Sequence, residues 1–106
     1  MRKTDIDEER IKGLSHDSTV LFSGTTHEQG YTITRIDLRR YVERKDERLG
    51  DYSLLTILVE TDRGSVEMKY DEGFRGQDAL DSAANMLRQH VGLAALINRA
   101  LIELQQ

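Results

Sequence analysis

No segment limits the possible folds more than residues 52–60, YSLLTILVE. Successive side chains of a β-strand point to opposite faces of its sheet. In this segment Leu55, Ile57 and Val59 share one face, and Leu54 lies on the other. Because a strand that is apolar on both faces must be covered on both, the segment predicts the central strand of a sheet.

Two strands are expected before this one. Residues 19–23, TVLFS, are short and rich in strand-forming types, and residues 24–30 predict a polar loop bounded by glycines. Residues 31–38, YTITRIDL, begin with alternating apolar positions, but the apolar phase then shifts by one residue. A strand cannot make that shift without an irregularity, so we expect a β-bulge near Thr34–Arg35.

The residues after the central strand predict a hairpin. Asp62, Arg63 and Gly64 suit a tight turn with the glycine at the left-handed position. Apolar residues of the following strand alternate with polar ones, at Val66, Met68 and Tyr70.

The last third of the chain predicts two helices. One apolar set recurs at helical spacing: Leu80, Ala83, Ala84, Leu87 and Val91. A second set follows out of phase with it: Leu93, Leu96, Ile97, Ala100, Leu101 and Leu104. A single straight helix would expose one of these stripes, so we expect a break at Gly92, with the glycine in a left-handed conformation.

A short N-terminal helix is also expected, with Thr4 as its N-cap, acidic residues in its first turn and Gly13 at its end. The predicted fold class is α+β. It consists of this helix, a four-stranded antiparallel meander and two C-terminal helices packed on one face. The length of 106 residues predicts a single domain, 1–106.

Composition excludes several classes of site. The chain has no cysteine, which rules out disulfides, thiol catalysis and cysteine-ligated zinc. Its net charge of −4 offers no cationic excess for a polyanion. The charged N-terminus does not predict a secretory signal, and no apolar run reaches the roughly 20 residues of a membrane span. We therefore expect a cytoplasmic protein that does not bind membranes.

No catalytic motif stands out. Ser15, His16 and Asp17 are consecutive, whereas the members of a catalytic triad come together from separate elements. His16, His27 and His90 fall on different predicted elements, without the spacing of a metal site. Residues 71–78, DEGFRGQD, match neither a calcium loop nor a phosphate loop and predict a strand-to-helix connection, with Phe74 under the helix. We expect no enzyme activity, metal or cofactor.

Residues 39–52, RRYVERKDERLGDY, form what we call the charged arm. It contains nine charged side chains and two tyrosines, with a net charge of +1. Because arginine and tyrosine are enriched at protein interfaces, the arm predicts a partner-binding surface. The candidate partner-binding residues are Arg39, Arg40, Tyr41, Glu43, Arg44, Asp46, Glu47, Arg48 and Tyr52.

Three alternatives remain for the charged arm. It is equally compatible with a solvated hairpin that binds nothing. Nucleic-acid binding is disfavoured, because the carboxylates among the cations would meet the phosphates. A helix is conceivable from the spacing of the apolar residues in 38–49, but the flanking segments favour two paired strands.

Residues 18–38, STVLFSGTTHEQGYTITRIDL, resemble the lead strand and polar loop of small phage-encoded anti-CRISPR proteins of type II-A. The resemblance extends to the order of the elements and implies a non-catalytic inhibitor that binds a larger protein or a nucleoprotein complex. It assigns no individual residue a role. The alternative is a housekeeping regulatory or ligand-binding module that acts as a homodimer.

Overall fold

The computed structural model describes residues 2–74, 78–89 and 92–106. It is an α+β fold in which the described residues form five strands and three helices. In chain order these are β1 (Arg2–Thr4), α1 (Glu8–Ile11), β2 (His16–Glu28), β3 (Tyr31–Arg44), β4 (Tyr52–Thr61), β5 (Gly64–Phe74), α2 (Ala79–Gln89) and α3 (Gly92–Gln105). No helix among the described residues is long and apolar enough to cross a membrane.

The strands form one sheet in the order β1-β5-β4-β3-β2. Strands β2 to β5 are the expected antiparallel meander, with β4 at its centre. The fifth strand, β1, was not expected, and it pairs in parallel with β5 through Ser65 to Glu67. The sequence gives no periodic signal for β1, because it has only three residues and none of them is apolar.

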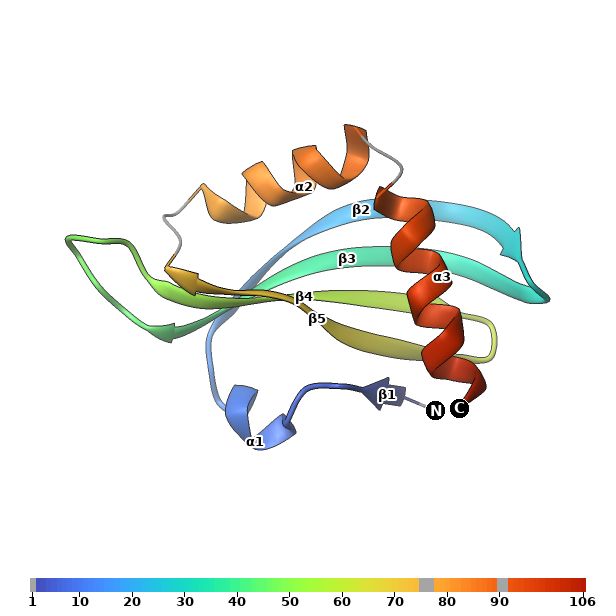
Figure 1. Cartoon of the computed structure of the whole chain (residues 1–106), viewed down its shortest axis with the longest axis horizontal. Helices are drawn as coiled ribbons and strands as arrows, with labels where there is room; N and C mark the ends of the chain where they lie inside the picture. Colours follow the sequence, from blue (N-terminus) through green and yellow to red (C-terminus); the bar gives the residue numbers. More distant parts are fainter. Residues whose placement is uncertain (1, 75–77, 90–91) are drawn as a thin grey trace.

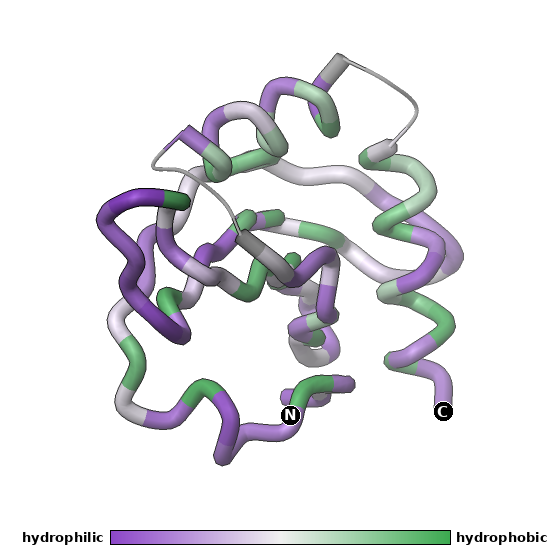
Figure 2. The backbone as a smooth tube through the Cα atoms, turned by 60° about the vertical axis from the view of Figure 1, so that its left-hand side comes forward, coloured by the Kyte–Doolittle hydropathy of each residue, from purple (hydrophilic) through white to green (hydrophobic). Residues whose placement is uncertain are grey.

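Helices α2 and α3 cover one face of the sheet (Figure 1). Figure 2 shows hydrophobic and hydrophilic positions alternating along α3, the helix that ends at the C-terminus. Strand residues Leu38, Ile57 and Met68 meet Ala84, Leu101 and other apolar positions of the helices in one hydrophobic cluster. This cluster is the main core.

The N-terminal segment covers part of the opposite face. A second, smaller cluster contains Ile6, Tyr41 and Leu54, with Ile11 and Leu14 packed against it. Leu54 and Leu55 are neighbours in β4, yet they belong to different clusters because their side chains point to opposite faces. This arrangement explains why the central strand is apolar on both faces.

The N-terminal helix is shorter than expected and begins later. Thr4 belongs to β1, where its hydroxyl accepts a hydrogen bond from the Ile6 amide at 3.0 Å. The N-cap of α1 is Asp7, whose carboxylate accepts from the Glu9 amide at 3.0 Å. Asp7 has the extended backbone of an N-cap, and Thr4 lies too far upstream to cap a helix that begins at Glu8.

Residues 24–28 are not the expected loop, because β2 continues through them to Glu28. The turn contains only Gln29 and Gly30, with φ of 50° and 85°, values that suit a tight two-residue hairpin. Gly24 instead lies at an irregularity in the β2–β3 pairing between Ser23 and Thr26. The bulge expected near Thr34 is confirmed, since the β3–β4 register shifts there.

The break between the two C-terminal helices is confirmed, but its expected cause is wrong. Gly92 is the first residue of α3 and does not have a left-handed backbone. A side chain at this position would instead lie 3.3 Å from Leu87 Cδ2. His90, Val91, residues 75–77 and the packing of Phe74 lie outside the described residues.

Candidate functional site

The charged arm is divided between the sheet and a loop. Residues 39–44 continue β3, so the arm is not a helix, and β4 begins at Tyr52. The β3–β4 hairpin extends beyond the rest of the sheet and beyond both C-terminal helices (Figure 1). We call residues 44–52 the hairpin tip.

The first three residues of the arm belong to the folded body. Tyr41 is 5% exposed and packs in the smaller cluster, and Arg40 is 7% exposed and donates a hydrogen bond to Asp17 at 3.0 Å. Only 23% of the Arg39 side chain is exposed. These predicted partner-binding residues are therefore part of the folded body. Strand β3 carries Arg39 and Tyr41 beneath the N-terminal segment, and it places Arg40 beside Asp17 of β2.

Arg39 and Tyr41 contact a buried carboxylate that sequence reasoning missed. Glu67 of β5 is 0% exposed and accepts hydrogen bonds from the Tyr41 hydroxyl at 2.8 Å and the Thr56 hydroxyl at 2.7 Å. Arg2 also donates to Glu67, and Arg39 Nη1 lies 3.6 Å from its carboxylate. The alternation of side chains along β5 predicts that Glu67 lies on the solvent-exposed face. Its burial depends on partners distant in the chain, which the sequence does not reveal.

The ionisation of this cluster follows from its partners. Burial raises the pKa of Tyr41, opposed by the hydrogen bond from Arg39 and reinforced by the Glu67 charge. Tyr41 is therefore protonated at neutral pH and can donate its hydroxyl proton to Glu67. For Arg39, burial acts to lower the pKa, but Tyr41 and Glu67 together raise it above its ordinary value.

Glu43 ties the base of the hairpin to α1. Arg10 holds the Glu43 carboxylate with two hydrogen bonds, 2.9 Å from Nε and 2.7 Å from Nη2. The same guanidinium reaches Glu72 at 2.5 Å, and this contact lowers the pKa of Glu72. Two carboxylates raise the pKa of Arg10. This bidentate geometry gives Glu43 a structural role.

The hairpin tip is held by the carboxylate of Asp46. Its Oδ1 accepts hydrogen bonds from the Arg48 amide at 2.9 Å and the Leu49 amide at 3.0 Å. These backbone hydrogen bonds lower the pKa of Asp46. Asp51 accepts from the Asp46 amide at 3.2 Å, and Gly50, with φ of 87°, allows the chain to reverse. The loop therefore has a defined conformation.

This loop exposes one large apolar side chain, Leu49, which is 57% exposed. Glu47 and Arg48 beside it are also exposed. At the base of the tip, the Arg44 guanidinium lies over the Tyr52 ring, 5.4 Å from its centroid. Leu49 was not a candidate site residue, although a single leucine in a run of charges was a visible signal.

Three residues of the other candidate motifs, His16, Asp17 and His27, lie on β2. His16 and Asp17 open β2, where the His16 ring lies 5.3 Å from the Tyr41 ring and Asp17 pairs with Arg40. His27 also lies on β2, within 3.2 Å of the Thr32 hydroxyl. Among residues 2–74, 78–89 and 92–106, no group of three potential ligands is arranged to hold a metal ion.

Fold and site together describe an α+β protein with a mainly antiparallel sheet, two covering helices and a protruding, internally bonded hairpin. Comparison with known protein families, with curated proteins and with solved structures finds no match to this chain.

Proposed function

We propose that this chain is a non-catalytic protein that binds a larger protein through the hairpin tip, and that this binding modulates or inhibits the partner. The observation that carries the proposal is the exposure of Leu49 on a loop fixed by Asp46. An ordered loop loses little conformational entropy on binding, so a preorganised apolar side chain is a favourable anchor. The fold itself does not require a leucine at this position.

The charges of the hairpin tip indicate the kind of surface it would meet. The carboxylates of Asp46 and Asp51 are directed to backbone amides of the loop. Lys45 and Arg48 are exposed beside Leu49, together with Glu47. The complementary partner surface is an apolar recess bordered mainly by carboxylates.

The state of Glu67 supports a non-catalytic role. A catalytic acid or base must reach its substrate and exchange a proton with it. The carboxylate of Glu67 is instead enclosed and bonded by Arg2, Tyr41 and Thr56. These contacts favour a structural role for Glu67.

The resemblance of residues 18–38 to anti-CRISPR proteins supports a narrower form of the proposal. These residues form β2 and the first half of β3, and so belong to the scaffold that carries the hairpin. In this form the partner is a defence nucleoprotein complex in the host cytoplasm, and the tip binds its protein component.

A ligand-binding module is the second candidate function. It is favoured by a pocket on the face of the sheet opposite to α2 and α3.

Site-specific photocrosslinking tests the proposal. A benzophenone side chain replaces Leu49 in one variant and Ile102 in another, since Ile102 is 48% exposed on α3 and serves as the matched control. In extracts of the cells from which the chain comes, we expect one discrete crosslinked protein from position 49 and none from position 102. Equal crosslinking from both positions, or none from position 49, would overturn the proposal.

A further inference from the structure

A pocket of about 530 Å³ lies between the N-terminal segment and the sheet. Its volume falls within the roughly 300–1,000 Å³ typical of small-molecule sites. Ile11 and Leu14 contribute apolar surface, and Tyr41 and His16 contribute aromatic rings. The residues that line it lie outside the hairpin tip, and the protein-binding proposal does not use the pocket.

Two guanidinium groups also line this pocket, those of Arg2 and Arg39. Both are held against the single buried carboxylate of Glu67. One carboxylate cannot neutralise two guanidiniums, so this trio carries a surplus positive charge. Glu67 thus fixes the position of two cations without cancelling both.

The hydrogen-bond donors of these arginines are not exhausted. Within the part of the chain that the structure describes, Arg39 donates only from Nη1, to the Tyr41 hydroxyl at 3.3 Å. Within the same residues, Arg2 donates only from Nη2, to Glu67. A guanidinium has five N–H donors in a planar fork that fits a carboxylate. Most donors of both guanidiniums therefore have no partner among the described residues.

The other charged side chains restrict the charge of a ligand. Lys12 adds a cation to the lining, whereas Glu8 and Glu9 add two carboxylates. Counted with Glu67, three cations face three carboxylates, so the surplus positive charge is local to Arg2 and Arg39 and the pocket offers no excess for a ligand with several negative charges. The pocket accordingly suits a single negative charge attached to an apolar body.

We infer that this pocket binds a small organic monocarboxylate, whose carboxylate meets Arg39 and Arg2 and whose apolar body lies on Ile11 and Leu14. Tyr41 is protonated and hydrogen-bonded to Glu67, so it adds no negative charge to the pocket. The N-terminal segment supplies one wall of the pocket, which includes Arg2 of β1, the strand paired with β5.

Amide shifts in an NMR titration of the full chain test this inference, with 4-phenylbutyrate as the probe. We expect saturable shifts at Lys12, Gly13 and His16. The uncharged analogue 4-phenylbutanol should bind at least about tenfold more weakly, the factor for one lost charge-assisted hydrogen bond. Inorganic phosphate should leave the same amides unchanged. Equal binding of the alcohol, binding of phosphate at these amides, or shifts confined to other surfaces would overturn the inference.

Two variants locate the carboxylate. Arg39→Lys keeps a positive charge beside Glu67 but removes the planar guanidinium. It should weaken the binding of 4-phenylbutyrate about tenfold. Lys12→Glu changes an exposed residue, so it tests the inference even if Arg39→Lys does not fold. It should weaken the binding of 4-phenylbutyrate but not that of 4-phenylbutanol. Arg35→Lys, on the same strand but paired with Asp37, is the matched control and should bind normally. Unchanged binding by both pocket variants would contradict the inference.

Discussion

Glu67 shows how much of this structure depends on individual polar contacts. Its carboxylate is fully buried and accepts from Arg2, Tyr41 and Thr56, which come from three other strands. Burial of a carboxylate is unfavourable unless hydrogen bonds and opposite charges replace its hydration. The cluster joins the N-terminal segment to the centre of the sheet, so each donor contributes to the positioning of both.

Removal of one donor should be measurable at the residue scale. Tyr41→Phe keeps the ring but removes the hydroxyl that donates to Glu67. We expect a loss of about 1–3 kcal/mol in the free energy of unfolding, measured by urea denaturation. Tyr70→Phe is the control, because the Tyr70 hydroxyl forms no hydrogen bond with the described residues, and it should stay within about 0.5 kcal/mol. Equal effects of the two changes would show that the hydroxyl of Tyr41 does not stabilise the cluster.

Asp46 gives a residue-scale prediction in pH. The pKa of Asp46 is lowered from 3.8 in the folded chain, so its contribution to loop order is fully present above that value. The contribution is lost as the pH falls through the lower, folded-state pKa. We expect the amide shifts of Arg48 and Leu49 to titrate together below pH 3.8. In Asp46→Asn this titration should disappear, and its persistence would assign it to another carboxyl group.

At the scale of elements, β4 holds the sheet together. Ile57 is 0% exposed and lies between Leu38 and Met68 on neighbouring strands. Ile57→Ala should lower the free energy of unfolding by about 2–5 kcal/mol, through lost burial and the cavity left behind. Ile102→Ala, at an exposed position of α3, should change it by less than about 0.5 kcal/mol. A loss below about 1 kcal/mol for Ile57→Ala would contradict the central position of β4.

The elements that were predictable are those with a local periodic signal. The alternation of Leu54 and Leu55 predicted β4, and the phase shift at Thr34 predicted the bulge. Residues 24–28 were misassigned because their glycine and polar side chains resemble a loop, although residues 26–28 pair with the start of β3. Strand β1 depends on main-chain pairing with a segment more than 60 residues away, for which a single sequence has no local signal.

In the candidate site, too, features with a local sequence signal were predictable and features that depend on tertiary contacts were not. The charged composition of residues 39–52 indicated a hairpin between two strands, which β3 and β4 form, but it did not indicate the position at which the hairpin leaves the sheet. The burial of Arg40 and Tyr41 results from contacts with Asp17 and the N-terminal segment. These contacts form only in the tertiary structure. The sequence therefore predicted an arm of residues 39–52, whereas the hairpin tip contains only residues 44–52.

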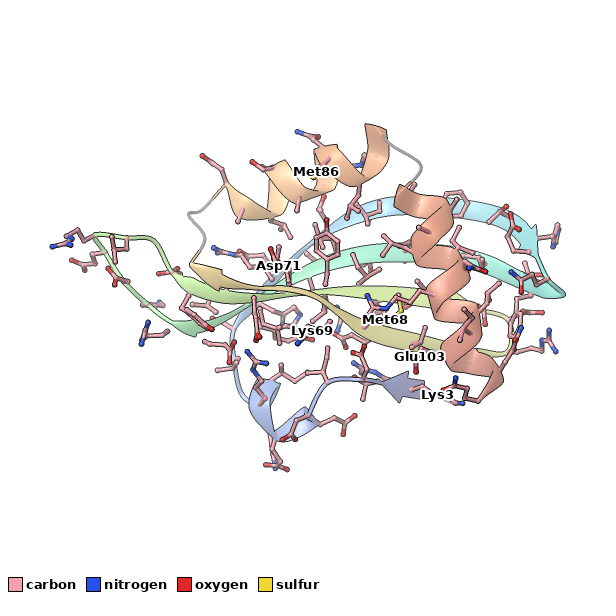
Figure 3. All side chains as sticks on the ribbon, viewed as in Figure 1. Lys3, Met68, Lys69, Asp71, Met86 and Glu103 are labelled. Carbon is pink, nitrogen blue, oxygen red and sulfur yellow. The ribbon has the colours of Figure 1, made fainter. Side chains whose placement is uncertain are left out.

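Across the whole molecule, the chain joins a layered body to one projecting hairpin, within an envelope of 46 × 31 × 17 Å. The N-terminal and C-terminal segments are joined by hydrogen bonds, because Lys3 donates to the backbone carbonyls of Glu103 and Gln106 at the end of α3. Figure 3 shows Lys3 beside Glu103, and Met86 on the far helix α2. The body thus supports the hairpin at a distance from both termini.

The overall charge gives a prediction at the same scale. With a net charge of −4 and a tip of mixed charge, the chain should not track phosphates. Its affinity for the crosslinked partner should fall less than about tenfold between about 50 and 200 mM salt, where phosphate-tracking proteins lose about 10³–10⁵. Fluorescence anisotropy across this salt range measures the dependence. A loss as steep as that of a phosphate-tracking protein would favour a nucleic-acid partner.

The most direct test of the hairpin tip as the recognition element is the dissociation constant for the crosslinked partner, measured by calorimetry for Leu49→Ala and Ile102→Ala. Both residues are large, apolar and about half exposed, so the two truncations remove similar surface from water. If Leu49 is an interface anchor, Leu49→Ala should weaken binding at least about tenfold, and Ile102→Ala should leave it within about twofold. Binding by Leu49→Ala within about twofold of the unmodified chain would contradict the account.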